Sequence, residues 1–184
     1  IYLFITQKIM DLKEYIRSIP DYPKKGILFR DITTLIKNEK AFENSIDQII
    51  ERSKNFKVDK IAAIESRGFV FASAVSYLLK KPFVLLRKKD KLPAETYSVD
   101  FELEYGKATI EMHKDSVKTN DSVLIIDDLI ATGGTARAAA KLIEMSGGQV
   151  SGFIFVINLF DLGGTDSLIK KKYKVENILN FPGH

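Results

Sequence analysis

The chain has 184 residues and a formal net charge of +4, and 45% of its residues are hydrophobic while 28% are charged. These proportions indicate a globular domain and exclude a disordered chain, and the lack of cysteine excludes disulfides, thiolate zinc sites and cysteine nucleophiles. No apolar run is long enough to span a membrane, so we expect a cytoplasmic protein.

The N-terminal part contains two predicted helices separated by turn-forming residues. Apolar residues at helical spacing predict a helix over residues 12–19, ended by Pro20, and a second over residues 42–55. Residues 21–26 between them are rich in turn formers. Met10 is a candidate start of the natural protein, in which case residues 1–9 are an extension.

From residue 60 onward, predicted strands alternate with helices. Residues 99–105 alternate apolar with acidic side chains, which predicts a half-exposed strand that turns at Gly106 and Lys107. The alternation predicts an α/β, doubly wound, mainly parallel sheet that binds ligands beyond the carboxyl ends of its strands. We expect the strands at residues 60–64, 83–86, 122–126, 150–158 and 175–179, and the helices at residues 69–79, 136–145 and 166–172.

The strand predicted at residues 122–126 leads into two acids, Asp127 and Asp128, and then a turn before a helix. Glycine-rich turns at helix starts direct several N–H groups at one point, which suits a phosphate monoester. Carboxylates suit ribose hydroxyls or a magnesium ion reached through water. We therefore predict a ribose 5-phosphate site, and a plain helix start with an acidic turn is the alternative. The turn and helix start consist of Ala131, Thr132, Gly133, Gly134 and Thr135.

Two more segments that follow predicted strands carry positive charge. Ser66 and Arg67 precede a helix and suit a diphosphate, although a surface arginine beside a turn is the alternative. The second segment suits a diphosphate leaving group, or is simply a solvated loop. Its cations are Arg87, Lys88, Lys89 and Lys91.

Residues 126–135 resemble the signature of the type I phosphoribosyltransferases, in the version found in members that use adenine. The similarity extends over residues 10–184 and includes residues 26–32, 66–69, 103–106, 158–164 and 181–184. It implies a single phosphoribosyltransferase domain over residues 1–184 with a small N-terminal base-binding hood at about residues 10–35 and a mobile β-hairpin lid at about residues 94–106. It also implies a homodimer.

The resemblance implies an enzyme of purine salvage. It would transfer the phosphoribosyl group from phosphoribosyl diphosphate to adenine and release AMP and diphosphate, with Mg²⁺ bound mainly through the substrate and through water to Asp127 and Asp128. Glu104 would assist proton movement near the base, unless it shares one solvated strand face with Asp100 and Glu102. The other implied roles are stabilisation of the leaving diphosphate by Arg67, Arg87 and Lys91, and substrate binding by Ser66, Lys88 and Tyr105.

The resemblance also implies where the base binds. Main-chain groups of Leu28 and Arg30 would match the amino donor and ring-nitrogen acceptor of adenine, and Phe29 and Leu159 would enclose the ring. The family commonly has proline where this chain has Lys25, which leaves the rigidity of the loop open.

Two alternatives to adenine transfer remain at this point. One is a phosphoribosyltransferase for another nucleobase, because main-chain contacts are poorly visible in a sequence. The other is a regulator that senses phosphoribosyl diphosphate and binds DNA. The basic residues are dispersed and no added basic domain is present, so we expect no nucleic-acid partner and no membrane partner.

Overall fold

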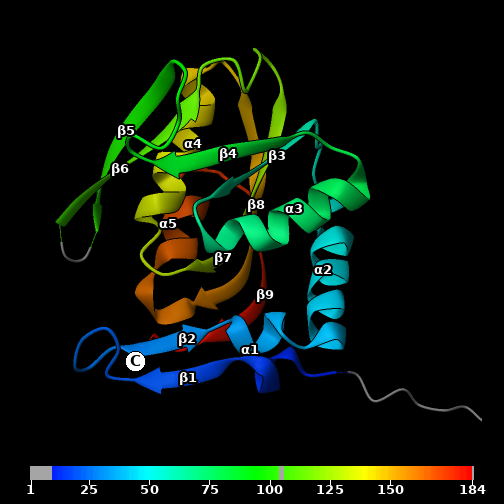
Figure 1. Cartoon of the computed structure of the whole chain (residues 1–184), viewed down its shortest axis with the longest axis vertical. Coiled ribbons are helices and arrows are strands. Elements are labelled where there is room, and N and C mark those ends of the chain that lie inside the picture. Colours follow the sequence, from blue (N-terminus) through cyan, green and yellow to red (C-terminus); the bar gives the residue numbers. More distant parts are fainter. Residues whose placement is uncertain (1–9, 104–105, 184) are drawn as a thin grey trace, which may run out of the picture. The chain divides into compact units, whose positions relative to one another are not determined.

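A computed structural model describes residues 10–103 and 106–183 of the chain. The chain divides into two compact units, one within residues 1–45 and one within residues 46–183. Helix α2, Glu39–Ser53, runs across the division (Figure 1). Within the described ranges, no helix combines the length and the apolar character needed to cross a membrane.

The first unit is built on a short antiparallel hairpin. Its elements are the 3-10 helix η1 (Leu12–Tyr15), strand β1 (Arg17–Pro20), strand β2 (Leu28–Asp31) and helix α1 (Thr33–Ile36). The predicted helix over residues 12–19 is wrong after its first turn. Ile16 takes an extended conformation, and residues 17–20 then pair with β2, with Ile19 opposite Phe29. This pairing outweighs the local helical spacing.

The loop between β1 and β2 is held by contacts of its own, as the turn formers in residues 21–26 predict. The N–H of Gly26 donates to Oδ1 of Asp21 over 2.7 Å. The N–H of Tyr22 donates to the carbonyl of Ile27, and the Tyr22 ring packs edge-on against Phe29 with centroids 5.2 Å apart. These contacts connect the two ends of the loop in which Lys25 lies.

The second unit contains a seven-stranded sheet in the order β5-β6-β4-β3-β7-β8-β9. Five neighbouring strands are parallel, and the hairpin β5–β6 is antiparallel at one edge. This confirms the predicted α/β class. The parallel strands are β4 (Phe83–Lys88), β3 (Lys60–Ile64), β7 (Ser122–Ile130), β8 (Gln149–Leu159) and β9 (Val175–Phe181), and the hairpin consists of β5 (Thr96–Leu103) and β6 (Gly106–His113).

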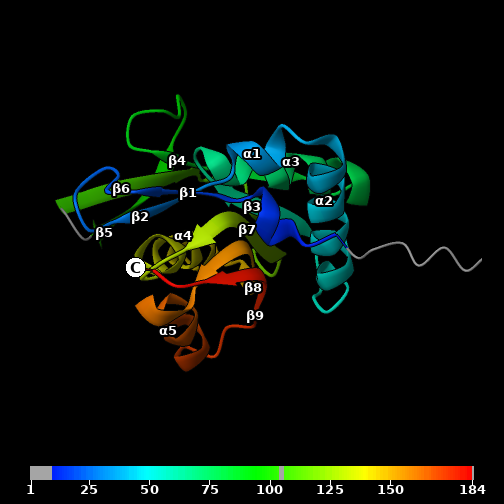
Figure 2. The ribbon, with the colours of Figure 1, turned by 90° about the horizontal axis from the view of Figure 1, so that it is seen from below.

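Helices cover both faces of this sheet. Figure 2 shows α3 (Arg67–Leu79) on one side of the strands, with α4 (Gly134–Met145) and α5 (Gly164–Lys170) on the other. Strand β3 is buried on both faces, as a central parallel strand requires. Ala62 and Ile64 share the α4-side core with Ala139 and Leu142, while the alternating side chains point toward α3.

Two strand boundaries differ from prediction because of pairing between strands. Strand β7 does not end at residue 126 but continues to Ile130, because residues 127–130 pair with β8. Asp127 and Asp128 therefore lie within a strand. The turn predicted at Gly106 and Lys107 is also wrong, since both residues belong to β6 and pair with β5.

The order of the strands reverses between β3 and β7. From β3 the chain crosses to β4 on one side, and the later strands β7, β8 and β9 follow on the other side. The carboxyl ends of β3 and β7 flank this switch point, which is where open α/β sheets bind ligands. The Ser66–Arg67 segment follows β3, and the glycine-rich turn follows β7.

Candidate active site

The two loops at the switch point are in direct contact. Nε of Arg67 lies 3.0 Å from Oδ2 of Asp128, which joins the loop after β3 to strand β7. At Gly68, a Cβ atom would lie 2.5 Å from Oδ1 of Asp127 and 3.3 Å from the carbonyl oxygen of Ile126, so a larger residue would require these groups to shift. The structure thus brings together the residues predicted to bind diphosphate and those predicted to bind ribose.

The two acids form an electrostatically unfavourable pair. Burial raises the pKa of Asp127 well above its ordinary value, and the neighbouring carboxylate of Asp128 raises it further. Burial also raises the pKa of Asp128, although the Arg67 guanidinium opposes the shift. The N–H of Asp128 donates to Oδ1 of Asp127 over 2.9 Å. Hydroxyl donors or a shared cation would relieve the remaining repulsion.

The glycine-rich turn has the form of a phosphate cradle. Gly133 has a φ of 78° and precedes the first residue of α4, Gly134. The first amides of a helix have no acceptor within it, and the first turn of α4 contains no acidic residue that would repel an anion. Thr132 is exposed and Thr135 is half-buried, so both are positioned at or near the surface of the turn beside Ala131.

Glu65 fixes the diphosphate loop to strand β4. Its carboxylate accepts from Nε of Arg87 over 3.1 Å and from the N–H of Lys88 over 3.1 Å. The Arg87 hydrogen bond is the main cause of a lowered pKa at Glu65, followed by burial, which acts in the opposite direction. Glu65 directly follows a buried strand, which is the only sequence signal of this role.

The predicted cations differ in how they are held. The Arg87 guanidinium is oriented by Glu65 and also donates to the carbonyl of Lys91 over 3.0 Å. Lys88, Lys89 and Lys91 are exposed. Arg87 therefore has a fixed direction, whereas the three lysines reach into solvent near the end of β4.

The predicted base-binding residues are divided between the two units. In the first unit, Leu28 and Phe29 are half-buried in β2, and the buried Arg30 donates to the hydroxyl of Ser18. The sheet of the first unit consists of β1 and β2. Leu159 belongs to the second unit, and its approach to Phe29 stays a prediction.

Leu159 lies at the end of β8, beside a polar network. Oδ1 of Asn158 accepts from the hydroxyl of Thr165 over 3.0 Å, and Nδ2 of Asn158 donates to Oδ1 of Asn180 over 3.0 Å. These contacts tie β8 to α5 and β9 and fix the position of Leu159, which is 8% exposed. Sequence reasoning assigned no role to these polar residues, whose partners are distant in the chain.

Two predicted site residues, Glu104 and Tyr105, lie outside the described residues. Among residues 10–103 and 106–183, no three acidic or histidine side chains gather as a metal site. Asp127 and Asp128 still provide the oxygen ligands that magnesium prefers. These two residues fit an ion that the substrate also holds.

The chain is similar to known proteins of one family over most of its length. Residues 32–181 match the phosphoribosyl transferase domain family. The chain is 78% identical over 175 residues to the adenine phosphoribosyltransferase of Pelagibacter ubique, covering 95% of this chain and 100% of that one.

Solved structures show the same similarity. The structure of adenine phosphoribosyltransferase from Thermoanaerobacter pseudethanolicus is 47% identical with a TM-score of 0.89, covering 92% of this chain and 98% of that one. A Saccharomyces cerevisiae adenine phosphoribosyltransferase is 35% identical with a TM-score of 0.84, covering 91% and 96%, and was solved with an imino-altritol bisphosphate and adenine.

Proposed function

This chain belongs to the phosphoribosyl transferase family, and on that premise we propose that it transfers the 5-phosphoribosyl group from phosphoribosyl diphosphate to adenine. The products are AMP and diphosphate, and the reaction serves purine salvage. The observation that carries the proposal is the contact between Arg67 and Asp128, because it places a diphosphate loop against a ribose-binding strand. The names of the relatives support adenine as the acceptor.

The donor is held at its two ends by different chemistry. The amides and hydroxyls of residues 131–135 bind the 5-phosphate at the start of α4. Asp127 and Asp128 accept further hydrogen bonds from the ribose hydroxyls, which reduces the repulsion between the two carboxylates. Holding the sugar at both points positions its anomeric carbon for attack.

The leaving diphosphate gains negative charge as the bond to the anomeric carbon breaks. Ser66, Arg67 and the first amides of α3 lie at one side of this position, and Arg87, Lys88 and Lys91 supply further positive charge from the end of β4. Magnesium held by the substrate and by Asp127 and Asp128 would neutralise part of the charge on the diphosphate. Glu65 orients Arg87 by accepting a hydrogen bond from its Nε.

The base is read by main chain and enclosed by apolar side chains. Main-chain groups of Leu28 and Arg30, both in β2, match the amino group and ring nitrogen of adenine. Phe29, supported by Tyr22, and Leu159, supported by Asn158, cover the two ring faces. Glu104 accepts or returns the proton that moves on the base as the glycosidic bond forms, and Tyr105 contacts the substrate beside it.

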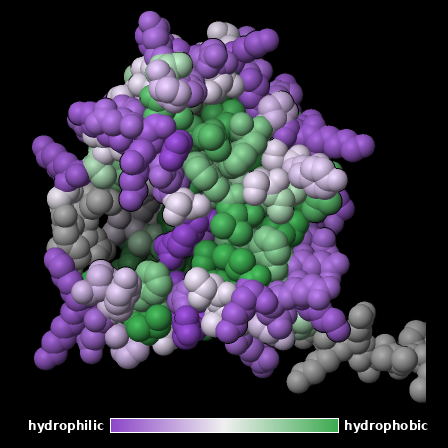
Figure 3. All heavy atoms as spheres, in the orientation of Figure 1, coloured by the Kyte–Doolittle hydropathy of each residue, from purple (hydrophilic) through white to green (hydrophobic). Residues whose placement is uncertain are grey.

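We further propose that the protein is a homodimer that uses the outer face of α3 and β4. Hydrophobic residues gather over this part of the surface in Figure 3. We call it the apolar patch, and it consists of Val70, Tyr77, Leu78 and Leu85, which are 36%, 82%, 53% and 39% exposed. An exposed tyrosine of this kind is typical of interface cores.

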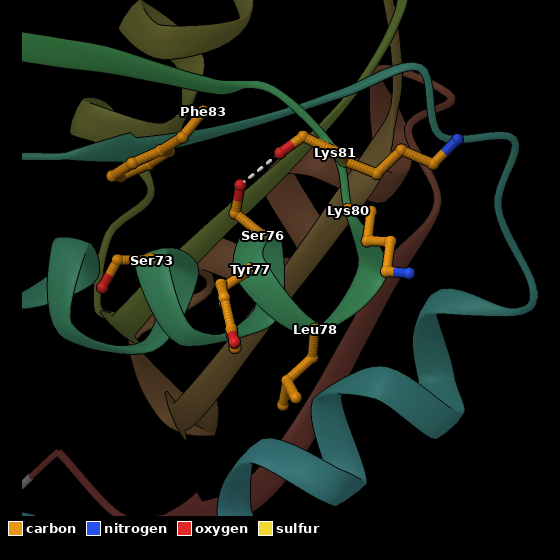
Figure 4. A pocket seen from close by; sticks show the side chains of 7 residues that line it. All are labelled: Ser73, Ser76, Tyr77, Leu78, Lys80, Lys81 and Phe83. Atoms are coloured by element: carbon orange, nitrogen blue, oxygen red, sulfur yellow. Dashed lines mark hydrogen bonds between the residues drawn. The ribbon is translucent and has the colours of Figure 1, made fainter.

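Two features favour a second copy as the partner of the apolar patch. A hollow of about 660 Å³ beside the patch has room for an apolar side chain. Tyr77 and Leu78 are among the residues that line it, and Figure 4 shows their side chains. Leu85 and Arg87 alternate along β4 and face the same side, so the patch is continuous with the diphosphate site. Tyr77→Glu combined with Leu85→Glu should shift sedimentation toward a monomer, and an unchanged dimer would contradict this surface.

The lid and the location complete the proposal. The lid at about residues 94–106, which includes strand β5, excludes water from the activated donor. We place the protein in the cytoplasm, in agreement with a sequence that contains no cysteine.

The activity itself is tested by combining the pure protein with phosphoribosyl diphosphate, adenine and magnesium. We expect AMP and diphosphate to form in equal amounts, and chelation of magnesium to abolish their formation. Omission of adenine separates transfer from simple hydrolysis of the donor. An absence of AMP in the complete mixture would contradict the proposed function.

A further inference from the structure

We propose that Arg137 is a positioning residue that holds the phosphate-binding turn in its binding conformation. Its Nη1 donates to the carbonyl of Thr132 over 3.0 Å and to the hydroxyl of Ser167 over 2.8 Å. The side chain thus connects the turn, the first part of α4 and the first part of α5. This inference rests on the proposed function, since it concerns the same phosphate site.

Ser167 is itself fixed in direction. Its hydroxyl donates to the carbonyl of Gly164 over 2.7 Å, and its N–H donates to the carbonyl of Gly163 over 3.0 Å. With its proton used in this way, the oxygen of Ser167 is free to accept from Arg137. The guanidinium is therefore held by a group that cannot easily turn away.

The start of α5 also touches the turn directly. A Cβ atom on Gly164 would lie 2.2 Å from the carbonyl oxygen of Ala131 and 2.9 Å from the amide nitrogen of Gly133. Glycine is required at residue 164 because backbone meets backbone there. The turn is consequently confined between Gly164 and Arg137. Gly164 belongs to residues 158–164, one of the segments of family similarity, and gains a physical role from this contact.

The direction of one peptide group explains why this matters for phosphate. In a trans peptide the C=O and N–H point opposite ways. Because Arg137 holds the carbonyl of Thr132, the N–H of Gly133 is directed away from the guanidinium. A cradle that binds an anion through backbone amides depends on such fixed directions, and a turn that rotated freely would lose affinity on ordering.

The charge of Arg137 supports the same conclusion. A cation in the first turn of a helix is unfavourable, because the helix N-terminus is already positive. An anion bound at the N-terminus of α4 removes this conflict. Arg137 therefore suits a turn that binds a dianionic phosphate.

The test measures binding of ribose 5-phosphate by titration calorimetry, together with the KM values for donor and adenine. Arg137→Met should weaken ribose 5-phosphate binding about tenfold and raise the donor KM similarly, while the adenine KM stays unchanged. Lys141→Met is the matched control, because Lys141 is an exposed cation one turn further along α4. It removes the same charge without touching the turn.

We call the contacts of Arg137 with the Thr132 carbonyl and the Ser167 hydroxyl the brace. Two more variants separate the effect of the brace from the effect of the positive charge alone. Arg137→Lys keeps the charge but shortens the donor, so we expect it to resemble Arg137→Met. Ser167→Ala should weaken binding less, and its effect should not add to that of Arg137→Met, because both act on one contact. Thermal unfolding of each variant checks that the fold is retained.

The outcomes distinguish a failure of the brace from a failure of the proposed phosphoribosyl site. If the wild type binds ribose 5-phosphate and Arg137→Met binds it equally well, the brace is contradicted. The same conclusion follows if Lys141→Met loses as much affinity as Arg137→Met, or if Arg137→Lys binds like the wild type. If the wild type does not bind ribose 5-phosphate at all, the proposed phosphoribosyl site fails, and the brace fails with it.

Discussion

Nε of Arg67 and Oδ2 of Asp128 lie 3.0 Å apart, and this ion pair couples the two halves of the donor site. Asp128 has a side chain that is 7% exposed, whereas that of Arg67 is 41% exposed. The carboxylate therefore has a fixed place, and the guanidinium extends from it toward solvent. A diphosphate can thus approach Arg67 without disrupting the buried acid.

Asp128→Asn should weaken use of the donor and leave the fold intact. Loss of one charge-assisted contact to the ribose and to Arg67 corresponds to a donor KM higher by about 10- to 100-fold. Steady-state kinetics with varied donor measures this change. Asp166→Asn, at an exposed acid in the first turn of α5, is the control and should leave the donor KM unchanged. A wild-type KM in Asp128→Asn would contradict the ribose role.

Asp127→Asn should stabilise the protein at neutral pH. The pKa of Asp127 is raised by burial and by Asp128, so the folded state retains a proton that the unfolded chain releases. The free energy of unfolding of the wild type therefore falls as pH rises from the unfolded toward the folded pKa, and stays lower above it. Asparagine carries no charge at any of these pH values, so Asp127→Asn lacks this fall in the free energy of unfolding.

Urea unfolding at several pH values measures the effect of Asp127→Asn. The gain in the free energy of unfolding should be largest near neutral pH and should vanish below the ordinary pKa of aspartate. Donor binding should weaken in the same variant, because a ribose acceptor is lost. A variant that is less stable than the wild type at neutral pH would show that the ionised pair does not cost stability.

Gly68→Ala should damage the site through steric contact alone. The new Cβ would meet Oδ1 of Asp127 at 2.5 Å and the carbonyl of Ile126 at 3.3 Å, and the latter is backbone. We expect a loss of about 1–3 kcal/mol in the free energy of unfolding and a higher donor KM. Ser73→Ala, at an exposed position of the same helix, is the control. Unchanged stability and kinetics in Gly68→Ala would mean that this close approach is not needed.

The sequence was sufficient to predict the features that depend on local pattern. Continuous apolar runs predict the parallel strands. The phosphate-binding turn at residues 131–135 is predictable because two acids precede it and threonines flank its glycine pair. Hairpin β1–β2 was not predicted, because residues 17–20 are extended only through pairing with residues 28–31. The continuation of β7 to Ile130 likewise depends on pairing with β8.

The supporting residues of the site were harder to predict than the binding residues. Glu65, Arg137 and Ser167 act through side-chain contacts with partners that are distant in the sequence or on another element. A single glutamate, arginine or serine has many uses, and no spacing rule singles these out. Their roles follow only once the fold brings β3 beside β4, and α4 beside α5.

Glu104→Gln should lower kcat about 100-fold or more while leaving both KM values nearly unchanged, because general acid–base assistance acts in the transition state. Glu102→Gln is the matched control, since Glu102 is an exposed neighbour on β5. Full activity in Glu102→Gln would show that the loss of kcat in Glu104→Gln does not come from removing any one charge on a solvated strand face. Equal effects of the two substitutions, or none, would contradict a proton-transfer role for Glu104.

The most direct test of adenine transfer compares purines as acceptors. With phosphoribosyl diphosphate and magnesium held constant, kcat/KM is measured for adenine, hypoxanthine and guanine. Two mismatched main-chain contacts at about 1–3 kcal/mol each predict a preference for adenine of at least about 30-fold, and up to about 10⁴-fold. A kcat/KM for hypoxanthine or guanine that equals or exceeds that for adenine would contradict the assignment and indicate a transferase for another nucleobase.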